Sequence, residues 1–259
     1  MPYSPAHGRR IMVRSDPTQD STQLPPAIPD EADSSAPRHR AVRSFVARAG
    51  RMTGAQERAW AELWPRYSVP DGDEPLDFEA LYGRSAPLTV EVGFGNGESL
   101  VALAAANPDR NFLGIEVHRP GVGHLMLRAE ALGLANLRIA CRDAVEVLER
   151  RVPDGSVSEL LLYFPDPWPK KRHHKRRIVQ PGFVELVARK LSAAGRFRLA
   201  TDWEPYAVHM LEVLSASASY SNESATGYAP RPDSRPVTRF ERRGERLGHG
   251  VWDLSFRKR

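Results

Sequence analysis

From Leu88 onward the chain alternates short apolar runs with longer amphipathic stretches, and this alternation constrains the fold more than any other feature. Such a pattern is typical of a parallel sheet whose faces are covered by helices. The apolar runs predict strands at 88–92, 111–116, 137–140, 158–164 and 196–201. The stretches between them predict helices at 98–106, 121–133, 143–150, 181–191 and 204–215. We therefore expect an α/β fold with a doubly wound, mostly parallel sheet.

The two ends of the chain follow different patterns. The last residues, HGVWDLSFRKR, alternate apolar and polar side chains and predict a final strand, antiparallel to the last parallel one. Residues 1–40 carry seven prolines among polar residues, so a disordered tail is expected there. Residues 41–87 are expected to form an appendage on or near the core, with a short helix from Gln56 to Trp64. Residues 88–259 would then form one domain.

Composition excludes several classes of protein. The longest apolar stretches fall far short of the roughly 20 residues that span a bilayer, and no apolar leader follows the first residues, so we expect a cytoplasmic protein without a membrane anchor. The single cysteine, Cys141, rules out an intramolecular disulfide, and no Cys/His set at ligand spacing predicts a metal. The net charge of +5 favours a polyanionic partner without naming one.

A glycine-rich turn follows the first predicted strand. The segment VEVGFGNGESL places Gly93, Gly95 and Gly97 where a ligand such as an adenosine-type cofactor can approach bare backbone. Dinucleotide-binding folds prefer G-x-G-x-x-G, with pyrophosphate on the helix N-terminus, whereas here the spacing is G-x-G-x-G and Glu98 follows. Its carboxylate would compete with pyrophosphate. Taken alone, the motif could still be an ordinary glycine turn.

Two acidic residues follow the next two predicted strands. Glu116 ends the second strand, where a carboxylate can bind ribose hydroxyls, and Asp143 follows the third, where it could meet an adenine. Singly, Glu116 could be a solvated strand end and Asp143 a helix N-cap. Because the carboxyl ends of parallel strands share one edge, the glycine turn and both acids together favour a cofactor site.

The fourth predicted strand runs into the segment YFPDPWPKKRHHKRR. Its Pro-Asp-Pro-Trp turn, with Asp166 and Trp168, is similar to the Asp/Asn-Pro-Pro-aromatic turn of amino-group methyltransferases; a rigid proline turn with a packed Trp is the alternative. Residues 170–177 then hold six Lys or Arg and two His. Such density beside the turn indicates a phosphate-binding surface, although a solvated charge run would look the same.

Two more segments are expected at this edge of the sheet. Asp202 and Trp203 follow the fifth strand, and the stretch before the last strand contains Thr238, Arg239, Phe240 and Glu241. The alternatives are a helix N-cap for Asp202 and ordinary surface charge for the second segment.

From about Val42 to the C-terminus, these segments resemble the bacterial tRNA (guanine-N7-)-methyltransferase family of class I, Rossmann-like methyltransferases. The matching segments are VRSFVARAGRMT, EVGFGNG, FLGIEVHRPGVG, RDAVEVL, YFPDPWPKKRHHKRRIVQ, TDWEPYA and TRFERRGERLGHGVWDL. The resemblance implies methyl transfer from S-adenosylmethionine to N7 of a guanine in the tRNA variable loop, usually position 46. Residues 88–259 would be the S-adenosylmethionine-dependent domain.

The resemblance also implies roles for individual residues. It implies that the cofactor is bound or faced by Glu91, Glu116, Asp143 and Asp166, around the turn of Gly93, Gly95 and Gly97, with Asp166 catalytic. It implies substrate contacts from Lys170, Asp202, Thr238, Arg239, Phe240 and Glu241. It implies RNA-backbone contacts from Arg172, His173, His174, Lys175, Arg176 and Arg177. Pro169 departs from the family, which usually has His or another polar residue there.

The chemistry needs neither a metal nor a general base, because guanine N7 carries a lone pair and no proton. Asp166 would orient the base and stabilise its developing charge, and Trp168 could stack on it. The alternatives are a methyltransferase acting on another RNA base or on protein, and a non-catalytic RNA-binding protein on the same scaffold. A nicotinamide-dependent oxidoreductase fits less well, given the glycine spacing and the basic run. Monomer and homodimer both remain open.

Overall fold

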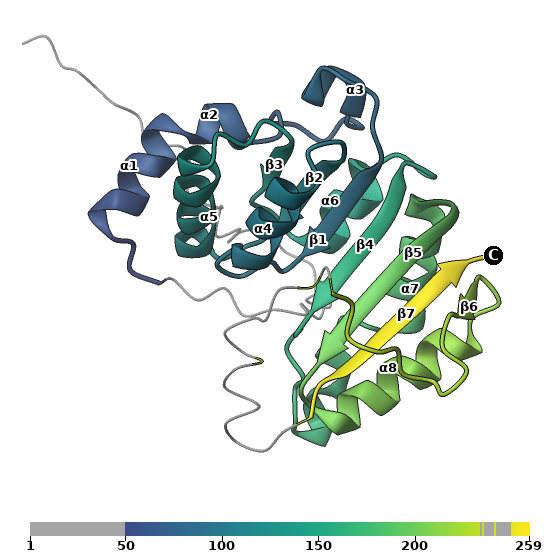
Figure 1. The fold of residues 1–259 in the computed structure, drawn as a ribbon. Helices are drawn as coiled ribbons and strands as arrows, with labels where there is room; N and C mark the ends of the chain where they lie inside the picture. The colour runs from purple at the N-terminus through teal and green to yellow at the C-terminus, as the bar shows by residue number, and fades with distance from the viewer. Residues whose placement is uncertain (1–49, 234, 236–240, 242–249) are drawn as a thin grey trace, which may run out of the picture. The chain divides into compact units, whose positions relative to one another are not determined.

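The computed structural model describes residues 50–233, 235, 241 and 250–259 of the chain. In these residues one sheet has the strand order β3-β2-β1-β4-β5-β7-β6 (Figure 1). Its parallel strands are β1 (Leu88–Val92), β2 (Asn111–Ile115), β3 (Leu137–Ala140), β4 (Val157–Tyr163) and β5 (Leu191–Thr201). The strand β7 (Trp252–Lys258) runs antiparallel to β5. The predicted α/β sheet, with its antiparallel last strand, is confirmed.

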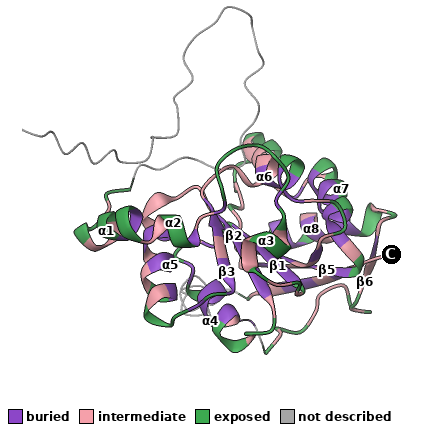
Figure 2. Ribbon diagram, turned by 90° about the horizontal axis from the view of Figure 1, so that it is seen from above, coloured by how far each residue is buried: buried purple, intermediate pink, exposed green. Residues whose placement is uncertain are grey.

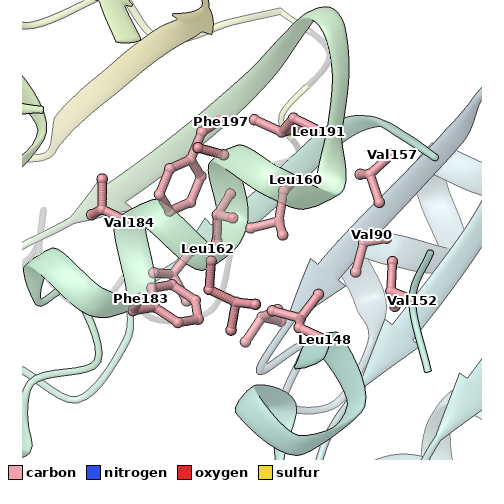
Figure 3. Close-up of a cluster of buried hydrophobic side chains, with 14 of the residues drawn as sticks. Val90, Leu148, Val152, Val157, Leu160, Leu162, Phe183, Val184, Leu191 and Phe197 are labelled. Carbon is pink, nitrogen blue, oxygen red and sulfur yellow. The ribbon is translucent and has the colours of Figure 1, made fainter. Parts of the chain in front are cut away.

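Helices cover both faces of the sheet. On one face lie α4 (Glu98–Ala106) and α5 (Arg119–Ala131), and on the other α6 (Ala144–Arg150), α7 (Pro181–Lys190) and α8 (Glu204–Ala216). Figure 2 shows the buried positions gathered on the strands between these layers. Figure 3 shows the packing on the second face, where Val90 of β1 and Leu160 of β4 meet Leu148 of α6 and Val184 of α7. No helix in the described part of the chain is long and apolar enough to cross a membrane.

The first two helices of the segment before β1 pack against the first face. The helix α1 (Gly54–Glu62) begins at a capping box, in which Thr53 and Gln56 bond each other's backbone N–H groups. It buries Trp60, whose indole N–H donates to the carbonyl of Arg119 at 3.1 Å. After α2 (Trp64–Tyr67), the backbone N–H of Val69 bonds the carbonyl of Ile139 at 2.9 Å, beside β3.

Several elements were not predicted from the sequence. The edge strand β6 (Tyr220–Asn222) is three residues long, too short to show periodicity, and forms by antiparallel pairing with β7. The helix α3 (Phe78–Tyr82) and the 3₁₀ helix η1 (Lys171–Arg176) are also short. The strand β5 starts at Leu191 and not at 196, with a register shift opposite β4 and a positive φ of 57° at Ala194.

The first turn of α5 lies directly against the glycine turn after β1. A Cβ atom built on Gly121 would lie 2.0 Å from the carbonyl oxygen of Gly95, a distance that no side chain tolerates. One built on Gly97, whose φ is +75°, would lie 2.4 Å from a methyl group of Leu125. The glycine turn and α5 therefore meet backbone to backbone at Gly95 and Gly121, with Leu125 packed against Gly97, and these contacts fix the turn.

We predict that Gly121→Ala destabilises the protein, by about 1–3 kcal/mol for an overpacked contact. Gly182→Ala is the matched control, since Gly182 also lies in the first turn of a helix and a Cβ there meets nothing within 4 Å. That variant should be neutral or slightly stabilising, because alanine restricts the unfolded chain. Urea unfolding of both variants measures the difference; equal free energies of unfolding would contradict the close contact.

Candidate cofactor and substrate site

A cavity of about 220 Å³ opens at the carboxyl ends of the parallel strands. It lies beside the edge at which β1, β2 and β4 end, as expected for ligand sites in open α/β sheets. Its wall combines backbone, apolar side chains and charged groups, contributed by Val92, Gly93, Ile115, Glu116, Val117, Arg142, Ala144, Leu162, Tyr163, Phe164, Pro165, Asp166 and Ile178. The predicted residues Gly93, Glu116 and Asp166 thus line one cavity.

The glycine turn needs its glycines. Gly93, Gly95 and Gly97 all have positive φ, of 73°, 58° and 75°, a conformation that other residues rarely adopt. A Cβ atom on Gly93 or Gly95 would meet nothing within 4 Å, so this stretch of backbone is open to a ligand.

The Glu116 carboxylate ties this turn to the end of β2. One oxygen accepts the backbone N–H of Gly95 at 2.8 Å, and the other accepts those of Val117 and His118 at 2.7 and 2.9 Å. Glu116 is therefore more than a solvated strand end, because it holds two walls of the cavity together.

Glu91 is a buried carboxyl group with an unsatisfied atom. Its side chain is on β1, opposite Leu161 of β4, and the residue is 3% exposed. Its Oε2 has no hydrogen-bond partner among the described residues. Burial, and then the nearby charge of Glu116, raises the pKa of Glu91 to about 8. The group is therefore neutral at neutral pH, and a cation placed beside Oε2 would favour its ionised form.

Asp143 caps α6. Its Oδ1 accepts the backbone N–H groups of Val145 and Glu146 at 2.8 and 3.3 Å. Its neighbours Arg142 and Ala144 line the cavity. The N-cap considered from the sequence is therefore present, and it places Asp143 next to the cavity wall.

The Pro-Asp-Pro-Trp turn has a strained backbone at both ends. Phe164 and Trp168 adopt positive φ, of 52° and 44°, which is costly for aromatic residues and concentrates at functional sites. Asp166 between them is exposed and lines the cavity. The Trp168 ring meets His173 edge-on, with centroids 5.8 Å apart, and the Arg176 guanidinium lies over it at 4.8 Å.

Arg177 braces this turn from inside. It is 4% exposed, its Nε donates to the carbonyl of Pro167 at 3.0 Å, and its guanidinium lies over the ring of Tyr206 at 4.8 Å. The resemblance implies an RNA contact for Arg177, whereas in this structure its guanidinium is buried against Pro167 and Tyr206.

The rest of the basic run forms η1 and its flanks. Lys170, Lys171, Arg172 and Lys175 are exposed, while His173, His174 and Arg176 are half-buried. Burial, and then the neighbouring Arg172 and Arg176, lowers the pKa of His173, so it adds little positive charge at neutral pH. The surface beside the cavity is thus strongly cationic through its Lys and Arg side chains.

The remaining predicted substrate residues differ in where they lie. Asp202 is half-buried just after β5, at the sheet edge that carries Asp166. Glu241 is 2% exposed, and both its oxygens accept N–H groups of Arg235, at 2.8 and 2.9 Å. Thr238, Arg239 and Phe240 lie outside the described residues. Sequence reasoning missed Arg235, since nothing in the pattern marks one arginine among many as buried.

No group of three or more His, Cys, Asp or Glu side chains in the described part of the chain could hold a metal ion.

Comparison with known proteins points to one family. The family model described as "Putative methyltransferase" matches residues 85–254. A tRNA (guanine-N(7)-)-methyltransferase from Klebsiella pneumoniae is 58% identical over 89% of this chain and 97% of its own length. One from Pseudomonas entomophila is 57% identical over 89% and 96%. Among solved structures, the 16S rRNA methyltransferase KamB matches 74% of this chain and 98% of its own, with a TM-score of 0.54 and 19% identity, a likeness of fold alone.

The raised pKa of Glu91 predicts how stability varies with pH. An unfolded glutamate titrates near 4.5 and the folded one at about 8, so between these values the folded state holds the extra proton and stability falls as pH rises. The variant Glu91→Gln cannot ionise, so its free energy of unfolding should fall less steeply with pH than that of the wild type. The two slopes should differ by at most about 1.4 kcal/mol per pH unit. Urea unfolding of the ligand-free protein from about pH 5.5 to about pH 8 measures this. Exposed Glu98, changed to Gln, is the control; a wild-type slope equal to that of Glu91→Gln would refute the assignment.

Proposed function

This chain belongs to the tRNA (guanine-N(7)-)-methyltransferase family, and we propose that it transfers a methyl group from S-adenosylmethionine to N7 of a guanine in the tRNA variable loop. The observation that carries the proposal is a single cavity lined by Gly93, Glu116 and Asp166, with exposed cations of the basic run beside it. A tRNA substrate would also mean that the protein works in the cytoplasm.

The cavity fits the proposed cofactor in two respects. The open backbone at Gly93 and Gly95 admits a bulky group. Glu91 lies just behind the cavity, one residue before the lining residue Val92, and its unpartnered Oε2 would accept a hydrogen bond from the ammonium of an amino acid moiety. Glu116 would accept ribose hydroxyls, and Asp143 would lie at the adenine. S-adenosylmethionine, when bound, supplies an electrophilic methyl group on a sulfonium.

On the substrate side, the protein has to position the base and stabilise charge. Guanine N7 attacks through a lone pair and gains positive charge, so no residue needs to remove a proton. Asp166, on a turn fixed by Arg177 and two prolines, would hold the guanine edge and stabilise that charge; Asp202 at the same sheet edge would assist. The indole ring of Trp168 offers a surface on which the guanine could stack. Stacking on the ring face that Arg176 covers would require the Arg176 guanidinium to move away.

The tRNA backbone would lie along η1. Lys170, Arg172 and Lys175 are exposed there and closely follow the Pro-Asp-Pro-Trp turn at 165–168, which we call the acidic turn. Phosphates bound to them would bring a nucleotide to Asp166. The side chain of Pro169 cannot make a polar contact with the substrate. At this point of the chain the polar contact would therefore come from Lys170.

We predict that Asp166→Asn lowers the single-turnover rate of methyl transfer to tRNA by on the order of 10² to 10³, because a preorganised charge partner is removed. The experiment follows a labelled methyl group from S-adenosylmethionine into tRNA and records thermal unfolding of the same preparation. Asp109→Asn, at an exposed aspartate away from the cavity, should leave the rate unchanged. A variant with full activity and lowered stability would make Asp166 a turn former only. Wild-type protein that transfers no methyl group to tRNA would refute the function.

The exposed cations predict the salt dependence of tRNA binding. Changing Arg172 and Lys175 together to Gln should weaken binding and lower the slope of log affinity against log salt, by roughly 0.7 to 0.9 for each phosphate that the variant no longer neutralises. The control pair is Arg128→Gln with Arg189→Gln, two arginines on the helices α5 and α7. Equal slopes for the two pairs would mean that η1 is not the RNA-binding surface.

A further inference from the structure

Arg235 is a fully buried cation held by two carboxylates. Its side chain has 0% exposure, and all three guanidinium nitrogens donate hydrogen bonds. Nη1 and Nη2 donate to Glu241 at 2.8 and 2.9 Å, while Nε and Nη2 donate to Asp253 at 2.9 and 3.0 Å. Arg231 adds a second cation, with its Nε 3.4 Å from Glu241. The four formal charges cancel.

This cluster lies directly behind the acidic turn. Asp253 is on β7 and pairs with Ala200 of β5, and the carbonyl of Ala200 accepts the backbone N–H of Phe164 at 2.8 Å. The Arg235 guanidinium is 5.6 Å from the ring centroid of Phe164 and 5.8 Å from that of Tyr163. Both distances lie within the range of cation–π contacts.

Phe164 is the residue that starts the turn with a positive φ. The chain passes from Tyr163 through Phe164 and Pro165 to Asp166, and all four line the cavity. Two carboxylates bind the planar guanidinium of Arg235 and fix its orientation. The guanidinium in turn restricts the positions of the Tyr163 and Phe164 rings that lie against it.

A buried ion cluster is a poor way to gain stability alone, because removing the charges from water offsets most of their attraction. Well-packed apolar side chains would stabilise this place equally well. What the cluster adds is a defined geometry at the base of the turn.

We propose that Arg235 is a positioning residue for methyl transfer: held by Glu241 and Asp253, it supports Tyr163 and Phe164 and so fixes the backbone that presents Asp166 to the cavity. The inference rests on the proposed function. It assigns Glu241 a part in the same support.

The test removes the cation without leaving an unpaired buried charge. Arg235→Met combined with Asp253→Asn removes one charge of each sign and leaves Glu241 with Arg231. Arg235→Lys keeps the charge but cannot bond both carboxylates through a planar fork. The control is Arg196→Met, at an arginine in the middle of β5 that pairs with Glu223. For each protein, thermal unfolding, affinities for S-adenosylmethionine and tRNA, the single-turnover rate and hydrogen exchange of the Phe164 amide are measured.

We expect the double variant to fold, to bind both ligands within about threefold of wild type, and to transfer methyl at least about tenfold more slowly, since small misplacements cost rate. Arg235→Lys should recover part of the rate, and the Phe164 amide should exchange faster in the double variant only. A folded double variant with a wild-type rate would overturn the proposal, as would loss of folding in both Arg235 variants, which would make the residue purely structural. If wild-type protein does not methylate tRNA, the proposed function fails, and Phe164 exchange still reports whether Arg235 supports the turn.

Discussion

The carboxylate of Glu116 accepts backbone N–H groups from two sides of the cavity, Gly95 after β1 and Val117 and His118 after β2. A loop with open backbone and positive φ has little to hold it, and these charge-assisted bonds, with α5 packed against Gly95, fix its path. Burial raises the pKa of neighbouring Glu91, and the charge of Glu116 raises it further. One acidic residue therefore sets both the shape of the cavity and part of its electrostatics.

Buried cations support the Pro-Asp-Pro-Trp turn, which forms another part of the cavity wall. Arg177 bonds the acidic turn through the carbonyl of Pro167, and Arg235 lies under the two aromatic residues that lead into it. Exposed Lys and Arg side chains of η1 continue this basic region on the surface. Buried arginines thus hold the turn, whereas exposed ones are available for phosphate. This division of roles joins a fixed turn to the surface that we propose binds RNA.

Much of this was predictable from the sequence, because parallel strands bring their carboxyl ends to one edge whatever the details of packing. Gly93, Glu116 and Asp166 follow three separate strands and meet in one cavity for that reason. The roles of Arg177 and Arg235 were not predictable, since burial of a charged side chain depends on contacts between residues far apart in the chain. The strand β6 was not predicted for a similar reason, because its three residues form a strand only through pairing with β7.

We propose that the base presented at this cavity is a variable-loop guanine and that its N7 is the methylated atom. To test this, an unmodified tRNA transcript is incubated with the protein and S-adenosylmethionine. The RNA is then treated with borohydride and aniline, which cleave it at N7-methylguanine. We expect cofactor-dependent cleavage at one variable-loop guanine. Methyl label that enters the tRNA without creating a cleavage site, or cleavage at guanines outside that loop, would contradict the claim.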